Sequence, residues 1–344
     1  MKSGIIGLPR SGKSTVFEAL TKSIASEGQR SESRIGTMLV PDQRIDVLSE
    51  MYQPKKTIYA QVEYFLPGAM HSKKDKSKEQ DIWTQVRDCD AIIHVIRNFG
   101  GYGFERPTPY DDFTKLDQEL ILADLVVIEK RLERLKLDKK RGKDISQEEL
   151  SLLNQCHKTL EAETPLRKKP DLATAHLLKG YAFVSGKPML VLFNNEDDDD
   201  KLPDSTGLDF TEDCMVIRGK LEQELAQMSP EDASEFLTEF DITESAMDRV
   251  IKRSYELLGL VSFFTVGDDE VRAWTIKKET QAIDAAGVIH TDIKQGFIRA
   301  EVLSYENLMA AKTFQEAKKK GTVKLEGKTY EVVDGDIINF RFNV

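Results

Sequence analysis

The sequence is poor in cysteine and has no long apolar run. Its 344 residues include three cysteines, Cys89, Cys156 and Cys214, which lie far apart and form no CxxC pair. This spacing argues against a disulfide framework and a zinc site, and it is typical of a protein in a reducing compartment. No apolar stretch approaches the roughly 20 residues that span a bilayer, and a strand-like run begins too soon after Met1 for a signal peptide. We therefore expect a soluble, cytoplasmic protein with no membrane partner.

The chain also lacks the excess of basic residues found in proteins that coat nucleic acid. It has 49 Lys and Arg against 59 Asp and Glu, a formal net charge of -10. Lys and Arg nevertheless gather in short runs at 73–76, 136–143, 167–169 and 318–320. Such runs can bind rRNA phosphates with salt-sensitive affinity, although charged helical faces are commonly only solvated. We expect a monomer that does not read DNA sequence.

A glycine-rich loop opens the chain. Residues 7–14 read GLPRSGKS and match the phosphate-binding pattern GxxxxGK[ST], between a strand-like run at 3–6 and a helical segment at 13–22. Gly7 and Gly12 allow the backbone to turn successive N–H groups toward an anion, and the start of the helix adds its positive end. The predicted nucleotide contacts are Gly7, Leu8, Pro9, Arg10, Ser11, Gly12, Lys13, Ser14 and Thr15.

Two side chains of this loop carry the expected chemistry. Lys13 can bridge the β- and γ-phosphates and offset charge in the transition state, so it is the candidate catalytic residue. The Ser14 hydroxyl can bind Mg²⁺ and is the candidate metal ligand. Elsewhere no Ser/His/Asp or Cys/His arrangement is evident, and His94, within an apolar run, is expected in the core.

Apolar strand-like runs separated by helical segments predict a parallel sheet covered on both faces. These runs are residues 3–6, 58–66, 91–97 and 188–193. Charged helical sequence from about Leu116 to Leu178 interrupts them, with Leu and Ile recurring at spacings of two to four. Gly142 and Lys143 lie where two helices would turn back, which predicts an inserted antiparallel hairpin.

The character of the sequence changes again after Gly259. Short strand-like runs (VSFFTV, VRAWTI, GFIRAEV, TYEVV and IINFRF) alternate with Gly and Asp turns, and one helical segment lies near 305–319. This pattern predicts a small mixed α/β domain that runs to Val344.

Several strings along the chain resemble the YchF subfamily of Obg-like ATPases. The opening GIIGLPRSGKSTVFEALTKS is similar to that family's GIVGLPNVGKSTLFNALT, and ELILADLVVIEKRLERL to its ELALADL segment. The most specific strings are EVRAWTI, AAGVIHTDIKQGFIRAEV and KTYEVVDGDIINFRFNV, which resemble the family's TGS domain, a ubiquitin-like β-grasp module. The resemblance spans nearly all of the chain and is weakest between about Gly28 and Gln80.

The resemblance implies an α/β protein with a Ras-like P-loop domain (1–115 and 179–258), an inserted helical hairpin (116–178) and a C-terminal TGS domain (259–344). It further implies binding of ATP in preference to GTP, with Mg²⁺, slow hydrolysis and association with the ribosome.

The family's second nucleotide motif, DxxG, has no aspartate here. The matching stretch is EYFLPG, residues 63–68, and the threonine of the family's first switch is missing, with Arg30 at about its place. Phosphate binding is spread over many backbone amides and Lys13, so it can survive the loss of one carboxylate, whereas phosphoryl transfer depends on positioning and charge stabilisation. A nucleotide-binding scaffold without turnover is therefore an alternative.

Base recognition is expected from the residues that follow the run at 188–193. In G-domain proteins NKxD serves this purpose, and the family resembles NxxE, whereas this chain has Asn194, Asn195, Glu196 and Asp197. Asn194 would pack the loop, and Asp197 could accept two donors from guanine, which favours a GTP-preferring switch as another alternative. Asn195 replaces the lysine over the base, and an acidic surface run without base contact remains open. Arg10 stands where the family has asparagine, either beside the phosphates or as a solvated loop arginine.

Overall fold

The computed structural model describes residues 1–23, 32–68, 76–101, 103, 105–204, 210–239 and 244–343. The chain divides into two compact units, which are described separately. Unit 1 consists of Met1–Thr37 and Glu63–Val250, and unit 2 of Met38–Val62 and Ile251–Val344. Among the described residues no helix is both long and apolar enough to traverse a bilayer. Arg30 of the altered first switch lies outside the described residues, as does the basic run at 73–75.

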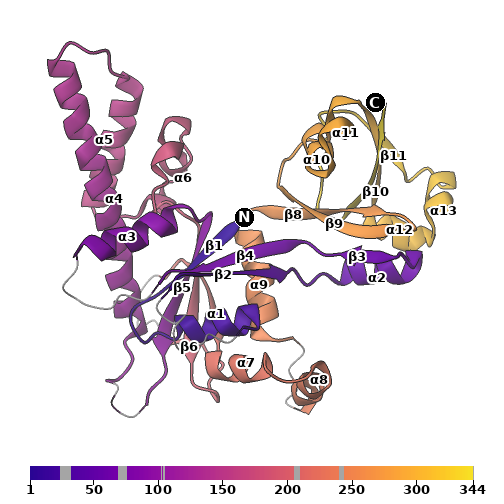
Figure 1. The fold of residues 1–344 in the computed structure, drawn as a ribbon, viewed down its shortest axis with the longest axis horizontal. Helices are drawn as coiled ribbons and strands as arrows, with labels where there is room; N and C mark the ends of the chain where they lie inside the picture. The colour runs from indigo at the N-terminus through magenta and orange to yellow at the C-terminus, as the bar shows by residue number, and fades with distance from the viewer. Residues whose placement is uncertain are drawn as a thin grey trace. The chain divides into compact units, whose positions relative to one another are not determined.

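The sheet of unit 1 has the strand order β2-β4-β1-β5-β6-β7 (Figure 1). Its strands are β2 (Arg34–Leu39), β4 (Gln61–Leu66), β1 (Lys2–Ile6), β5 (Ala91–Asn98), β6 (Met189–Asn195) and β7 (Asp213–Ile217). β1 pairs in parallel with β4 and β5, and β6 with β5 and β7. β6 is buried throughout and β5 over its first six residues, as expected for a parallel sheet with both faces covered. The predicted Ras-like α/β fold is confirmed.

The helices of unit 1, apart from those that follow α4 in the inserted hairpin described below, are α1 (Lys13–Thr21), α3 (Lys76–Arg87), α4 (Pro109–Lys140), α7 (Gly219–Leu225), α8 (Pro230–Glu239) and α9 (Ala246–Leu257, which ends in unit 2). α1 packs on β1 and α4 on β5. Leu116 and Leu120 of α4 join Ile92 and Ile96 of β5 in one apolar core. α1 packs against α7, and both begin next to the carboxyl ends of the central strands.

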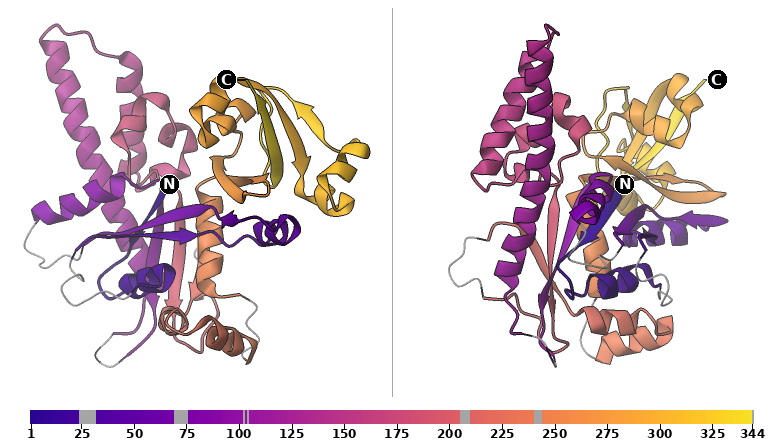
Figure 2. Two further views of the ribbon diagram at one scale, coloured as in Figure 1. Left: turned by 45° about the vertical axis from the view of Figure 1, so that its right-hand side comes forward. Right: turned by 60° about the vertical axis from the view of Figure 1, so that its left-hand side comes forward.

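The predicted hairpin is formed by α4 and α5 (Gln147–Glu161), which lie side by side in both views of Figure 2. α4 begins at Pro109, because the first turn of a helix tolerates proline. Ser146 caps α5: its hydroxyl accepts a hydrogen bond from the Glu149 N–H at 3.1 Å. The helices share an apolar seam that includes Ile128 and Leu153. A short 3₁₀ turn (Leu166–Lys168), α6 (Pro170–Ala173) and another 3₁₀ turn (His176–Tyr181) return the chain to the sheet.

A second six-stranded sheet forms unit 2, in the order β11-β10-β12-β8-β9-β3. Its strands are β3 (Lys56–Ile58), β8 (Leu260–Val266), β9 (Glu270–Lys277), β10 (Phe297–Ser304), β11 (Lys324–Glu326) and β12 (Asp336–Phe342). Its helices are α2 (Gln43–Tyr52), α10 (Ala282–Ile289), α11 (Thr291–Gln295), α12 (Tyr305–Ala311) and α13 (Phe314–Lys319). β8 is antiparallel to β9 and parallel to β12, so the strands other than β3 form a β-grasp sheet.

The structure corrects several expected elements. The run at 58–66 is not one strand: β3 pairs with β9 in the second sheet, whereas β4 pairs with β1 in the first. The TYEVV run forms only an isolated bridge, between Glu331 and Gln281. The helical segment at 305–319 is two helices, because Lys312 adopts a left-handed φ of 65° and Thr313 caps a new helix. Helix α10 was not anticipated, since its alanines gave no marked amphipathic pattern.

Candidate functional site

The loop between β1 and α1 has the backbone that a phosphate-binding turn requires. Gly12 has a φ of 89°, which favours glycine, and a Cβ there would lie 2.2 Å from the Asn194 Nδ2. A Cβ on Gly7 would lie 2.4 Å from the Val95 carbonyl oxygen. The Ser11 N–H donates to the Leu8 carbonyl at 3.2 Å and closes the turn. Both glycines are therefore needed for this conformation, as the sequence pattern predicts.

Asn194 ties this loop to two other elements of unit 1. It is 4% exposed at the end of β6, and its amide is used on both sides. The Asn194 Nδ2 donates to the Ser11 carbonyl at 3.1 Å, and its Oδ1 accepts from the Gly219 N–H, at the start of α7, at 2.9 Å. A Cβ at Gly219 would lie 2.7 Å from the same oxygen, so glycine is needed there too.

The residues present fit a nucleotide phosphate. Lys13 forms no ion pair with any described residue, and its ammonium donates to the Leu8 carbonyl at 3.3 Å. Burial lowers the pKa of Lys13, so an anion close to it would offset the cost of desolvating the charge. The Ser11 hydroxyl is buried without a hydrogen-bond partner among the described residues. Ser14 is exposed in the first turn of α1, as a hydroxyl that bound Mg²⁺ would have to be.

The remaining predicted contacts differ in exposure. Pro9 and Arg10 are exposed, Leu8 and Thr15 half-buried, and Arg10 has a φ of 65°. The carboxylate of Asp197 is exposed, 3.9 Å from the Lys220 ammonium, and its carbonyl accepts from Arg218 at 3.4 Å. The structure therefore brings Asp197 beside the start of α7.

Asn195 is held differently from its neighbour. Its Oδ1 accepts from Asn98 Nδ2 at 2.9 Å, and its Nδ2 donates to the Lys201 carbonyl at 2.7 Å. The side chain thus joins β5 to the loop after β6, and it is 4% exposed.

The end of β4 carries no carboxylate. Gly68 corresponds to the glycine of DxxG, and three residues before it stands Phe65, 6% exposed. Leu66 and Pro67, between them, are buried. Apolar side chains at this strand end cannot hold a metal-bound water, so the metal would depend on Ser14, the phosphates and its own waters.

Sequence reasoning missed the turn that starts α7. Arg218, Gly219 and Lys220 follow β7 and lie against Asn194 and Asp197. The sequence signal that could have indicated this turn is Gly219, which stands between Arg218 and Lys220 directly after the residues of β7.

Comparison with known proteins agrees with this geometry. Residues 260–343 match the YchF-GTPase_C family model, described as a protein of unknown function (DUF933). The Ribosome-binding ATPase YchF of Bacillus subtilis is 37% identical, with all of both chains covered. That of Haemophilus influenzae is 35% identical, over all of this chain and 99% of the relative. This chain belongs to the YchF family.

Solved structures extend the YchF likeness to three dimensions. The YchF GTPase of Schizosaccharomyces pombe superimposes with a TM-score of 0.82 at 28% identity, covering 99% of this chain and 97% of that one. A GTP binding protein from Pyrococcus horikoshii has a TM-score of 0.59 at 18% identity over the full length of both chains, which shows a shared fold alone. The α/β arrangement around the phosphate loop is therefore that of a known YchF structure.

Proposed function

We propose that this chain is a P-loop switch that binds ATP with Mg²⁺, hydrolyses it slowly and associates with the ribosome. The observation that supports nucleotide binding most directly is the loop itself. Its glycines are fixed in place, the partly buried Lys13 has no ion pair among the described residues, and Asn194 connects it to β6 and α7. The names of the relatives, ribosome-binding ATPase, support the rest. We further propose that the protein acts in the cytoplasm, where ribosomes are, and that it is a monomer.

The phosphate loop and two of the residues after β6 have proposed roles. Backbone groups of residues 7–15 would surround the phosphates, Lys13 would offset charge in the transition state, and Ser14 would hold Mg²⁺. The ion would supply charge compensation between the phosphates. Asp197 would lie toward the base, with Asn194 fixing the loop from which it projects.

Two alternatives rest on particular residues. Phe65 in place of the DxxG aspartate favours a nucleotide-stabilised scaffold without turnover, because the apolar strand end cannot position the metal or its water. The exposed carboxylate of Asp197 favours a GTP-preferring switch, because it could accept from guanine N1 and N2.

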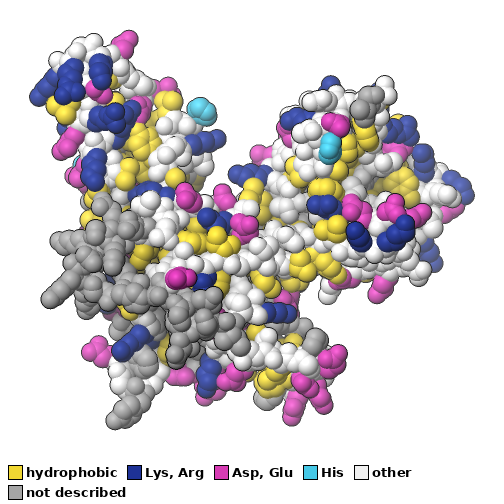
Figure 3. Space-filling view, in the orientation of Figure 1, with side chains coloured by type: hydrophobic (Ala, Val, Ile, Leu, Met, Phe, Trp, Pro, Cys, Tyr) yellow, Lys and Arg dark blue, Asp and Glu magenta, His cyan; other side chains and the backbone are white. Residues whose placement is uncertain are grey.

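The tip of the α4–α5 hairpin is the proposed contact with rRNA. Residues 130–143 contain eight Lys and Arg against two acidic residues, in a chain whose net charge is -10. Figure 3 shows dark blue side chains gathered there. Among the described residues Lys136, Lys139, Lys140 and Arg141 form no ion pair and are exposed. Exposed cations without an ion-pair partner among the described residues suit a phosphate backbone.

Calorimetric titration with ATP and with GTP, each with Mg²⁺, tests the proposal. We expect ATP to bind more tightly than GTP and Lys13→Ala to abolish binding, because the variant removes the loop's cation. Lys22→Ala, just beyond the end of α1, is the control and should bind normally. Tighter binding of GTP than of ATP would favour the GTP-preferring switch, in which Asp197 binds guanine. No binding of either nucleotide would refute the proposal. Phosphate release measured with and without ribosomes separates a switch from a scaffold.

A further inference from the structure

Strand β12 of unit 2 runs on past the strand beside it. β8 and β12 pair at Phe264 and Ile337, and β8 ends two residues later, at Val266. β12 therefore continues from residue 340 to 342 beyond the end of β8, with β10 paired along its other side. In the part of the chain that the structure describes, no strand pairs with this side of β12 beyond Ile337. Its backbone there forms a free sheet edge, which an extended peptide can join.

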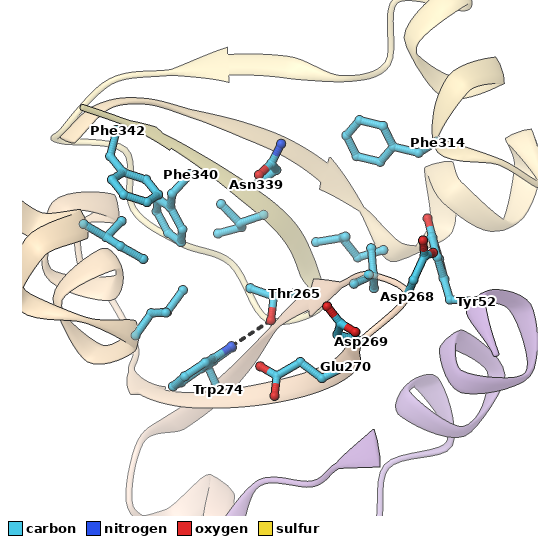
Figure 4. Close-up of a pocket in the computed structure, with 16 residues that line it drawn as sticks. Tyr52, Thr265, Asp268, Asp269, Glu270, Trp274, Phe314, Asn339, Phe340 and Phe342 are labelled. Atoms are coloured by element: carbon cyan, nitrogen blue, oxygen red, sulfur yellow. Dashed lines mark hydrogen bonds between the residues drawn. The ribbon is translucent and has the colours of Figure 1, made fainter. Parts of the chain in front are cut away.

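An aromatic cavity of about 530 Å³ opens beside this edge. Figure 4 shows Phe340, Phe342 and Trp274 gathered at one end and Phe314 at the other. Ile289 and Ile293 also line it. Phe342 is 44% exposed although it is aromatic and lies at the end of a paired strand, so part of this apolar surface faces solvent.

The charged residues that line the cavity are all acidic. Asp268, Asp269 and Glu270 line it, and no Lys, Arg or His is among its lining residues. Figure 4 shows the carboxylates of Asp269 and Glu270 between the two aromatic ends. Asp269 pairs with Lys55 at 2.8 Å, but both side chains are more than three-quarters exposed, so a partner's cation could replace Lys55 at little cost. The acidic lining would repel nucleic-acid phosphates.

Trp274 already holds a cation on its ring. The Arg272 guanidinium lies 3.8 Å from the ring centroid, and the indole N–H donates to Thr265 at 2.9 Å. The indole is thus fixed in orientation and can report on a ligand in the cavity.

We propose that the fork between β12 and the β8–β9 hairpin binds an extended segment of a protein partner in which apolar residues alternate with Lys or Arg. The segment's backbone would pair with β12 at residues 340–342, an apolar side chain would enter the aromatic cavity, and a basic one would meet Asp269 and Glu270. All the residues that line this site belong to unit 2, whereas the phosphate loop belongs to unit 1.

Trp274 fluorescence tests the site in the full chain. The sequence has two tryptophans, so Trp83→Phe leaves Trp274 as the sole reporter. The probe is the acetylated, amidated peptide Val-Arg-Val-Arg-Val; one comparison peptide has Glu for Arg, and another has Pro for the central Val and so lacks an N–H. We expect the basic peptide to change the Trp274 emission and both comparison peptides to bind at least about tenfold more weakly. Hydrogen exchange of the amides at 340–342 should slow when it binds.

Variants separate the charge from the fold. Asp269→Asn with Glu270→Gln should weaken binding of the basic peptide about tenfold and flatten its salt dependence. Glu306→Gln, an exposed carboxylate of unit 2 outside the cavity, should change nothing. Equal affinity for the basic and acidic peptides, no change in the double variant, or no binding of the basic peptide would each overturn the proposal. Tighter binding of a short uridine oligonucleotide, sensitive to Phe342→Ala, would also overturn it.

Discussion

Asn194 connects three elements through one amide. It donates to the Ser11 carbonyl and accepts from Gly219, so it fixes the phosphate loop against β6 and α7. We expect Asn194→Ala to weaken ATP binding about tenfold and to lower the free energy of unfolding by about 1–3 kcal/mol, because two buried backbone groups lose their partner. Calorimetric titration and urea unfolding measure the two effects. Asn154→Ala, whose amide is exposed on α5, is the control; unchanged ATP affinity in Asn194→Ala would show that the loop holds its shape without this bridge.

His94 is a buried base without a hydrogen-bond partner. Both ring nitrogens are unpartnered among the described residues, and the ring stacks on Phe113 at 5.6 Å. Burial, helped by the nearby Arg167 charge, lowers the pKa of His94 from 6.5 to about 3. The unfolded chain therefore takes up this proton near pH 6.5 and the folded chain only near pH 3. The contribution of His94 to the free energy of unfolding is therefore fully present above pH 6.5. It falls as the pH drops toward 3, by about 1.4 kcal/mol for each pH unit.

We expect His94→Leu to remove this acid sensitivity. At pH 7 the variant should be about 1–3 kcal/mol more stable, because no unpartnered polar atoms remain buried. From pH 7 to pH 5 the unmodified chain should lose about 2 kcal/mol more than the variant. Urea unfolding at both pH values measures this, with the exposed His176→Gln as control. An identical loss in chain and variant would mean that His94 is not the group that titrates.

At the scale of elements, the positive charge at the tip of the α4–α5 hairpin can be removed without changing its buried side chains. Changing Lys136, Lys139 and Lys140 to Gln leaves the buried seam of α4 and α5 untouched. We expect ribosome affinity to fall about tenfold and to depend less steeply on salt, because fewer counterions are released. Co-sedimentation with ribosomes at several salt concentrations measures both.

The control removes the same charge from unit 2. Lys277, Lys278 and Lys328 are exposed there, and changing all three to Gln alters the net charge equally. If both triple variants lose affinity alike, net charge rather than the hairpin tip governs binding.

Local signals predicted the elements that local sequence determines. The phosphate loop and the hairpin turn at Gly142 depend on residues adjacent in the chain, so their patterns were sufficient. The division of the 58–66 run into two strands depends on residues distant in the sequence: Ile58 pairs with Arg272 and Glu63 with Lys2. No residue within the run indicates that its two parts belong to different sheets. Likewise Gly219 matters only because Asn194 reaches it, a contact between residues 25 positions apart that spacing cannot show.

At the scale of the molecule, each unit has its own core and its own tryptophan. Trp83 is half-buried and packs against the core of unit 1, and Trp274 is half-buried and packs against that of unit 2. Because the phosphate loop belongs to unit 1, ATP at 100 times its dissociation constant should stabilise that unit by about 2.7 kcal/mol. In single-tryptophan variants, the thermal midpoint reported by Trp83 should rise with ATP and Mg²⁺, and that reported by Trp274 should not. Equal shifts in both would mean that the units unfold as one.

Unit 2 is built from two separate segments of the chain: residues 38–62, and all residues from 251 onward. A ribosome adds about 5–20 residues each second, so roughly 190 residues of synthesis separate these two segments by about 10 to 40 seconds. During that interval Ile45 and Leu48 of α2, fully buried in the finished protein, have no β8 or β9 to cover them. For the same interval β3 lacks β9, the strand with which it pairs in the finished protein. A nascent chain of this protein therefore carries an uncovered apolar helix and an open strand edge through most of its own translation, the state in which a chaperone at the exit tunnel has most to bind.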